Sequence, residues 1–260
     1  MDDPGLEGHE LARLLAFLRT VNRRLGGVES MLALLREWSV DWPRDRPVTM
    51  LDVATGSADL PLAARQWAQG AGFDLRITAI DANPGAIREA RRHLGNISGI
   101  ELIELDARDI ERRFGPASFQ YVHAGLFLHH LADRDIPVML RAMDRVASHG
   151  IIWNDLVRSR RGWLVWWLLT AFQPLHVRHD ARVSYRAGFT PAEVLGHTAA
   201  AGITYAGFRS NFNWQRFTLA GNKPCVGRSP AEPNAGSSAR NGRVGAVSVA
   251  VAEPSAREPG

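Results

Sequence analysis

Short apolar runs alternate with helix-spaced apolar stripes through the middle of the chain. The short runs predict strands at residues 48–53, 75–80, 100–105, 119–124 and 151–153. Apolar residues three and four positions apart predict helices at residues 59–68, 84–94 and 133–148. The first run has little polar alternation, which is typical of a strand buried on both faces. The strand–helix order therefore predicts an α/β fold with a doubly wound parallel sheet.

Two further helices are predicted before the sheet, at residues 9–25 and 28–38, with Gly26 and Gly27 between them. Neither lies next to a predicted strand in the sequence. We expect residues 1–42 to form an N-terminal helical cap; covering one edge of the sheet is an equal alternative. At the other end, residues 227–260 contain no aromatic residue, leucine or isoleucine, which predicts a disordered tail.

Composition narrows the class of protein only slightly. The length of 260 residues suits one domain with additions, here residues 43–226, and the net charge of +4 comes from 31 basic and 27 acidic side chains. No clustered basic stripe is present, so nucleic acid is not expected as a partner. Cys225 is the single cysteine, so an intramolecular disulfide is excluded and no cysteine-based metal site is expected. With a single cysteine, a reducing cytoplasm is the simplest expected location of the protein. No signal peptide is expected at the N-terminus.

The turn after the first predicted strand contains small residues, including Ala54, Gly56 and Ser57. Small side chains let the backbone turn tightly and let a ligand approach it. Asp52 places a carboxylate at the end of this strand, where open α/β sheets bind ligands. A tight strand-to-helix turn without a ligand would also explain the composition.

The second and third predicted strands each end on an acid, Asp81 and Asp106. An acid in the first of these places can accept hydrogen bonds from both ribose hydroxyls of a nucleotide. The segment that starts at Asp81 also suits a helix start, with Asn83 as the N-cap and Pro84 in the first turn. Asp106 suits a bond to an adenine amino group, or a turn.

The segment from Asp52 to Ala58 resembles the acid-x-Gly-x-Gly-x-Gly turn of class I S-adenosylmethionine-dependent methyltransferases. Ala54 and Ala58 replace two of the three glycines. The resemblance covers residues 48–155 and, less specifically, extends to residue 222. It is similar in detail to the small-molecule subgroup that contains ubiquinone and menaquinone biosynthesis methyltransferases. It implies a Rossmann-like, mostly parallel seven-stranded sheet with an antiparallel last strand, for which residues 203–208 and 214–220 are suitable.

The resemblance also implies S-adenosyl-L-methionine as the cofactor. The implied contacts are Asp52, Ala54, Gly56, Ser57, Asp81, Ala82, Asp106, Ala107 and His123. In this family an acceptor nucleophile attacks the sulfonium methyl in line, so that alignment in a dry pocket can supply much of the catalysis.

Two adjacent histidines follow the fourth predicted strand, His129 and His130. An imidazole can take a phenolic or enolic proton near neutral pH, and we favour His130 as the base over His129. Packing or capping of the next helix is an equally good explanation. No third ligand at suitable spacing is present, so no metal is expected.

An insertion at residues 156–190 is expected on the acceptor side of the domain. Its apolar run is too short to cross a bilayer, and its tryptophans suit a flat or lipid-like acceptor, or weak contact with a membrane surface. Completion of the core is the alternative. The expected acceptor contacts are Asn154, Trp163, Trp167, His176, His179 and Arg182.

The sequence thus predicts a methyltransferase that acts on a small aromatic or polyketide-like molecule, as in secondary metabolism, with O-methylation favoured. Two alternatives stay open: C-methylation of a quinone precursor, and a non-catalytic scaffold that keeps the fold. The sequence does not indicate an oligomeric state.

Overall fold

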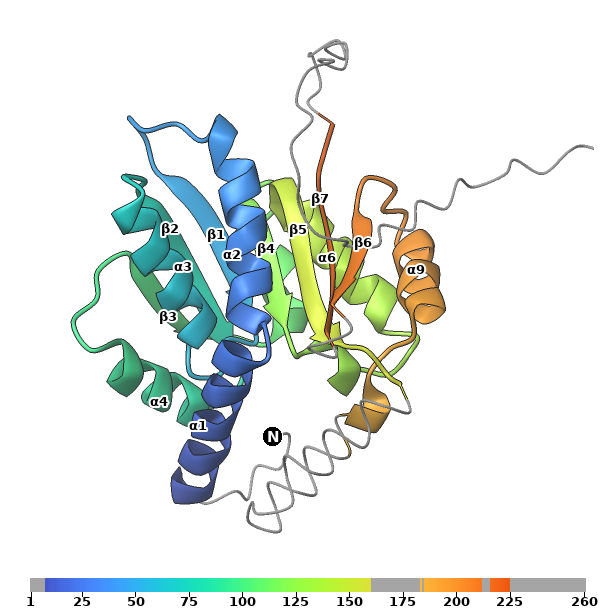
Figure 1. Ribbon diagram of the computed structural model, residues 1–260, viewed down its shortest axis with the longest axis horizontal. Coiled ribbons are helices and arrows are strands. Elements are labelled where there is room, and N and C mark those ends of the chain that lie inside the picture. Colours follow the sequence, from blue (N-terminus) through green and yellow to red (C-terminus); the bar gives the residue numbers. More distant parts are fainter. Residues whose placement is uncertain (1–7, 160–182, 184, 212–215, 225–260) are drawn as a thin grey trace, which may run out of the picture. The chain divides into compact units, whose positions relative to one another are not determined.

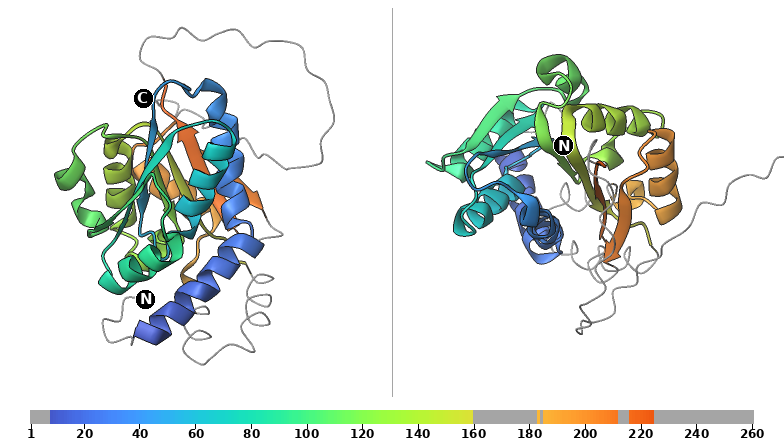
Figure 2. Two further views of the ribbon diagram at one scale, coloured as in Figure 1. Left: turned by 90° about the vertical axis from the view of Figure 1, so that its left-hand side faces the viewer. Right: turned by 90° about the horizontal axis from the view of Figure 1, so that it is seen from above.

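A computed structural model describes residues 8–159, 183, 185–211 and 216–224, in which a seven-stranded sheet has helices on both faces (Figures 1 and 2). The strand order is β3-β2-β1-β4-β5-β7-β6. The strands are β1 (Val48–Val53), β2 (Leu75–Asp81), β3 (Ile100–Glu104), β4 (Phe119–Gly125), β5 (Ala147–Leu156), β6 (Gly207–Asn211) and β7 (Arg216–Asn222). The helices are α1 (Gly8–Arg24), α2 (Gly27–Trp38), α3 (Asp59–Gly70), α4 (Pro84–Leu94), α5 (Ile110–Phe114), α6 (Ile136–Val146) and α9 (Pro191–Ala200). Three 3₁₀ turns are Ser39–Asp41, Ala107–Asp109 and Leu128–His130.

The pairing confirms the predicted fold class. Strands β1 to β5 pair in parallel, whereas β7 runs antiparallel to both β5 and β6. All parallel strands therefore present their carboxyl ends at one edge, where a ligand site is expected.

Two predicted boundaries need correction. Strand β5 has ten residues instead of the three predicted, because the chain becomes extended directly after α6 ends at Val146. The sixth strand begins at Gly207 instead of residue 203, since Ile203 is buried in the core before the strand starts. The first residues of the predicted seventh strand, 214 and 215, lie outside the described residues, as do residues 227–260.

Strand β1 is buried on both faces, as its apolar run predicted. Leu51 and Val53 pack in the cluster that contains α6, whereas Met50 packs in the cluster that contains α2 and α3. Each of these three side chains has no exposed surface. Because period-two alternation sends neighbouring side chains to opposite faces, an all-apolar strand needs helices on both sides.

The two N-terminal helices have different positions. Helix α2 packs on one face of the sheet, where Trp38 stacks on Tyr121 with ring centroids 5.0 Å apart. Helix α1 packs instead against α4, through Leu11, Leu15 and Ala86. Helix α2 thus covers a face of the sheet and not one edge, and α1 lies beyond the carboxyl ends of the strands (Figure 1).

The turn after β1 adopts the backbone conformation that glycine favours, although two of its residues are alanines. The φ angles are +55° at Ala54, +57° at Gly56 and +56° at Ala58. A residue with a Cβ loses about 1–2 kcal/mol in this left-handed region. At Gly56 a Cβ would also lie 3.3 Å from Leu15 Cδ2, so α1 packs closely over the turn.

We expect Ala54→Gly to stabilise the protein by about 0.5–1 kcal/mol, because relief of the left-handed strain exceeds the entropy that glycine adds to the unfolded chain. Urea unfolding of both proteins measures the difference. Ala90→Gly, in the interior of α4, is the matched control and should lose at least about 1 kcal/mol. Equal losses for both variants would contradict the strain at Ala54.

Candidate functional site

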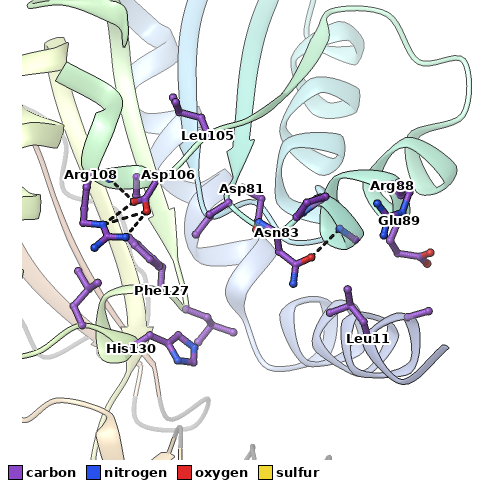
Figure 3. Close-up of a pocket in the computed structure, with 18 of the residues that line it drawn as sticks. Leu11, Asp81, Asn83, Arg88, Glu89, Leu105, Asp106, Arg108, Phe127 and His130 are labelled. Atoms are coloured by element: carbon purple, nitrogen blue, oxygen red, sulfur yellow. Dashed lines mark hydrogen bonds and ion pairs between the residues drawn. The ribbon is translucent and has the colours of Figure 1, made fainter. Parts of the chain in front are cut away.

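A cavity of about 750 Å³ opens at the carboxyl edge of the sheet (Figure 3). The turn after β1, the ends of β2 and β3 and the loop after β4 contribute to its wall, and α1 and α4 complete it. Six predicted site residues line it: Ala54, Asp81, Ala82, Asp106, Ala107 and His130. The structure thus brings residues from four separate segments of the sequence to one cavity.

A second, smaller cavity of about 40 Å³ lies next to the first, because both are lined by Ala54 and Leu126. Besides Ala54, three predicted residues line it: Asp52, Gly56 and Ser57. Asp59 and Asn22 also line it, and the sequence analysis assigned a ligand role to neither. The predicted cofactor residues therefore divide between two adjoining cavities.

Asp81 connects the end of β2 to the turn after β1. Its Oδ2 accepts a hydrogen bond from the Gly56 amide at 2.9 Å, and its Oδ1 accepts one from the Asn83 amide at 2.9 Å. Asn83 Oδ1 caps α4 by accepting from the amides of Gly85 and Ala86. Asn83 is therefore the cap of α4, and Asp81 lines the large cavity, so that the two explanations for this segment are compatible.

Asp106 is paired within its own turn. Its carboxylate accepts hydrogen bonds from the Arg108 amide at 2.9 Å and from the Arg108 guanidinium, as Figure 3 shows. The Arg108 hydrogen bond lowers the pKa of Asp106, against the opposing effect of partial burial. An adenine amino group in this part of the cavity would therefore meet a carboxylate that is ionised and held in place.

His123 is buried behind Asp52 and lines neither cavity. The two residues are register partners on β4 and β1, and His123 Nδ1 lies 2.5 Å from Asp52 Oδ1. The histidine has no exposed surface, and a Cβ at Gly125 would lie 3.0 Å from its Cε1. The expected direct contact of His123 with the cofactor is corrected accordingly: the imidazole can orient the Asp52 carboxylate.

The adjacent histidines have different environments. His129 is 8% exposed, and its Nδ1 lies 2.7 Å from Oδ1 of the fully buried Asp155. Burial raises the pKa of Asp155, but the charge and hydrogen bond of His129, with other donors, lower it below its ordinary value. His130 is exposed and lines the large cavity. Of the two, His130 is therefore the one placed to meet an acceptor.

Asn154 does not line either cavity. It is 1% exposed, donates to Thr218 Oγ1 at 2.8 Å and accepts from Arg216 at 2.8 Å. Its amide is thus used between β5 and β7, which corrects the expected acceptor contact. The other expected acceptor residues, Trp163, Trp167, His176, His179 and Arg182, lie outside the described residues.

Several lining residues were missed by the sequence analysis. Leu11 and Ala12 reach the large cavity from α1, and Arg88 and Glu89 reach it from α4. These residues follow ordinary helical patterns of apolar and charged positions, which do not indicate a ligand. Phe127 was also missed, but its place could have been inferred, because it lies in the same loop as His129 and His130.

The described residues contain no group of three or more histidine, cysteine or acidic side chains placed to hold a metal ion. None of their helices combines the length and the apolar character required to cross a membrane.

The comparisons with known proteins concern the domain and the fold. Residues 50–150 match the family model described as a methyltransferase domain, whereas the comparison with curated proteins finds no match. A solved structure described as a candidate O-methyltransferase from Nostoc punctiforme is 16% identical (TM-score 0.59, 82% of this chain, 60% of that chain). Magnesium protoporphyrin IX methyltransferase from Synechocystis, with bound S-adenosylhomocysteine, is 15% identical (TM-score 0.52, 77% and 83%). Human N-acetylserotonin methyltransferase, in complex with S-adenosylmethionine, is 16% identical (TM-score 0.56, 84% and 56%).

The fold and the sequence match define a methyltransferase domain. Residues 50–150 match a methyltransferase domain, and the solved structures that share the fold include two with S-adenosylhomocysteine or S-adenosylmethionine bound. The resemblance found at Asp52 to Ala58 is confirmed at this level. The chain spans 60% of the length of the Nostoc structure and 56% of the human one.

We expect the two histidines to differ in their effect on stability. His129→Ala removes the Nδ1 partner of the buried Asp155 carboxylate and should cost about 3–5 kcal/mol. His130→Ala, at an exposed position, should cost less than about 1 kcal/mol. Urea unfolding at neutral pH measures both; similar losses would show that His129 and Asp155 do not form a stabilising pair.

Proposed function

We propose that the protein transfers the methyl group of S-adenosylmethionine to an oxygen of a small aromatic or polyketide-like molecule. The observation that carries this proposal is the large cavity, which is lined by the Asp81 carboxylate and, from another segment of the chain, by Phe127 and His130. The Asp81 carboxylate suits a ribose. Phe127 suits an aromatic acceptor, and His130 suits the proton that the acceptor loses.

The described residues fit the cofactor on chemical grounds. The Asp81 carboxylate lines the large cavity, and the amides of Gly56 and Asn83 donate to its two oxygens and hold it in place at the position expected for a ribose. Ala82 and Ala107 supply small walls on either side, with Asp106 placed for the adenine amino group. Asp52 lines the adjoining small cavity, where it would favour the ammonium of the amino-acid end.

The residues of the chain would act mainly by alignment. When bound, S-adenosylmethionine supplies an electrophilic methyl group on a sulfonium sulfur. Phe127 and Leu126 form an apolar wall that excludes water from the acceptor. His130 would accept the proton of the acceptor hydroxyl, so that the oxygen becomes a better nucleophile. Residues 160–182, which carry further predicted contacts, lie outside the described residues.

Methylation of carbon in a quinone precursor would use the same base with an enolic acceptor, and a scaffold would bind the cofactor without turnover.

The single cysteine supports a reducing compartment such as the cytoplasm.

We expect S-adenosylmethionine and S-adenosylhomocysteine to raise the melting temperature by about 5–10 °C at a hundred times their dissociation constants, because both bind the folded state. NAD should give no shift. Asp81→Asn should reduce the shift by more than half, since only one of its side-chain atoms remains an acceptor. A shift with NAD alone would overturn the cofactor assignment, and an unchanged shift in Asp81→Asn would overturn the ribose contact.

We expect methylated products from a panel of phenols, detected by mass spectrometry, and a turnover at least about tenfold lower in His130→Ala, in keeping with general base catalysis. Raised pH should partly restore this rate, since more of a phenol then ionises without a base. His149→Ala replaces an exposed histidine that lines neither cavity and serves as the control. A normal rate in His130→Ala at every pH would contradict the role of a base, and cofactor binding without any product would favour a scaffold.

A further inference from the structure

A buried polar network connects the small cavity to strands β5 and β7. Asn22, near the end of α1, donates from Nδ2 to Asp59 Oδ2 at 3.0 Å. Its Oδ1 accepts from Arg216 Nη2 at 2.7 Å, and Arg216 Nη1 donates to Asn154 Oδ1 at 2.8 Å. The network therefore joins α1, the start of α3 and strands β5 and β7.

Arg216 is a buried cation without a carboxylate in direct contact among the described residues. It is 1% exposed, and its Nε has no hydrogen-bond partner there. Burial lowers the pKa of Arg216 to about 10, with Asp155 and Asp59 acting in the opposite direction, so the guanidinium stays charged at neutral pH. A buried charge of this kind is costly unless other groups compensate for it. The nearby carboxylates supply that compensation at longer range.

The network fixes which way the Asn22 amide points. A guanidinium has only donors, so it must face the Asn22 carbonyl oxygen. The Asn22 NH₂ group is then left for Asp59, which must act as an acceptor. Arg216 thereby holds the Asp59 carboxylate at the wall of the small cavity through one intervening side chain.

Two carboxylates line this cavity, Asp59 and Asp52. Burial raises the pKa of Asp59, and the charge of Asp52 adds to this effect, against the hydrogen bond from Asn22. Among the described residues, no lysine or arginine lines this cavity. A bound cation would relieve the repulsion between the two carboxylates.

We propose that Asp59 is a second carboxylate for the ammonium of the cofactor's amino-acid end, and that Asn22 and Arg216 are positioning residues for it. The inference rests on the proposed cofactor site, in which Asp81 binds the nucleoside and the small cavity receives the amino acid. It assigns a recognition role to a residue that otherwise only begins helix α3.

Calorimetric titration with two nucleosides tests the role of Asp59. S-adenosylhomocysteine carries the amino-acid end, whereas 5′-methylthioadenosine has the same adenosine and sulfur without it. Asp59→Asn should weaken S-adenosylhomocysteine by at least about tenfold, equal to about 1.4 kcal/mol, and leave methylthioadenosine within about twofold. Asn22→Ala should show the same selectivity with a smaller loss. Asp41→Asn, an exposed carboxylate that lines neither cavity, should change neither affinity.

The outcomes separate the two proposals. If the wild-type protein binds neither nucleoside, the proposed cofactor site fails. If the wild type binds both and Asp59→Asn leaves the preference for S-adenosylhomocysteine unchanged, the role of Asp59 fails alone. Equal weakening of both nucleosides would also overturn it, because the residue would then support the fold of the site and not the ammonium. Methylthioadenosine binding thus shows whether each variant is folded.

Discussion

The hydrogen bond from the Gly56 amide to Asp81 is the interaction on which the site depends. It ties the turn after β1 to the end of β2 and fixes one carboxylate oxygen while the other accepts from Asn83. The same bond therefore shapes the turn and orients the acid toward the cavity. A turn with positive φ at Ala54 and Ala58 is strained, and an anchor of this kind helps to hold it.

Much of the architecture could be predicted from the sequence because its cause is local. Met50, Leu51 and Val53 require cover on both faces, and the acids at the ends of successive parallel strands must share one edge. Strand β5 was underestimated because Ser148 and His149 interrupt the apolar pattern, although their backbone pairs as strand. Extended backbone with polar side chains is recognised only by its partner strands.

The site was predictable in its residue types but not in their pairing. His123 has the chemistry of a ligand contact, yet its register with Asp52 places it behind that carboxylate. Asn154 is used by Arg216 and Thr218 for the same kind of reason. Such outcomes depend on contacts across 62 to 71 positions of sequence, which no local pattern contains. Asp155 follows Asn154 directly, and only the fold brings it to His129.

Helix α1 gives the two cavities different characters. Its first half contributes Leu11 and Ala12 to the large cavity, where adjacent walls carry both acids and arginines. Its end contributes Asn22 to the small cavity, which two carboxylates line and where the compensating arginine lies one side chain away. An uncharged adenosine and an amino-acid end that carries an ammonium group would differ in the same way. Helix α1 therefore lines both cavities. The charge around each cavity is set by the acids in its wall, which come from β1, β2 and α3.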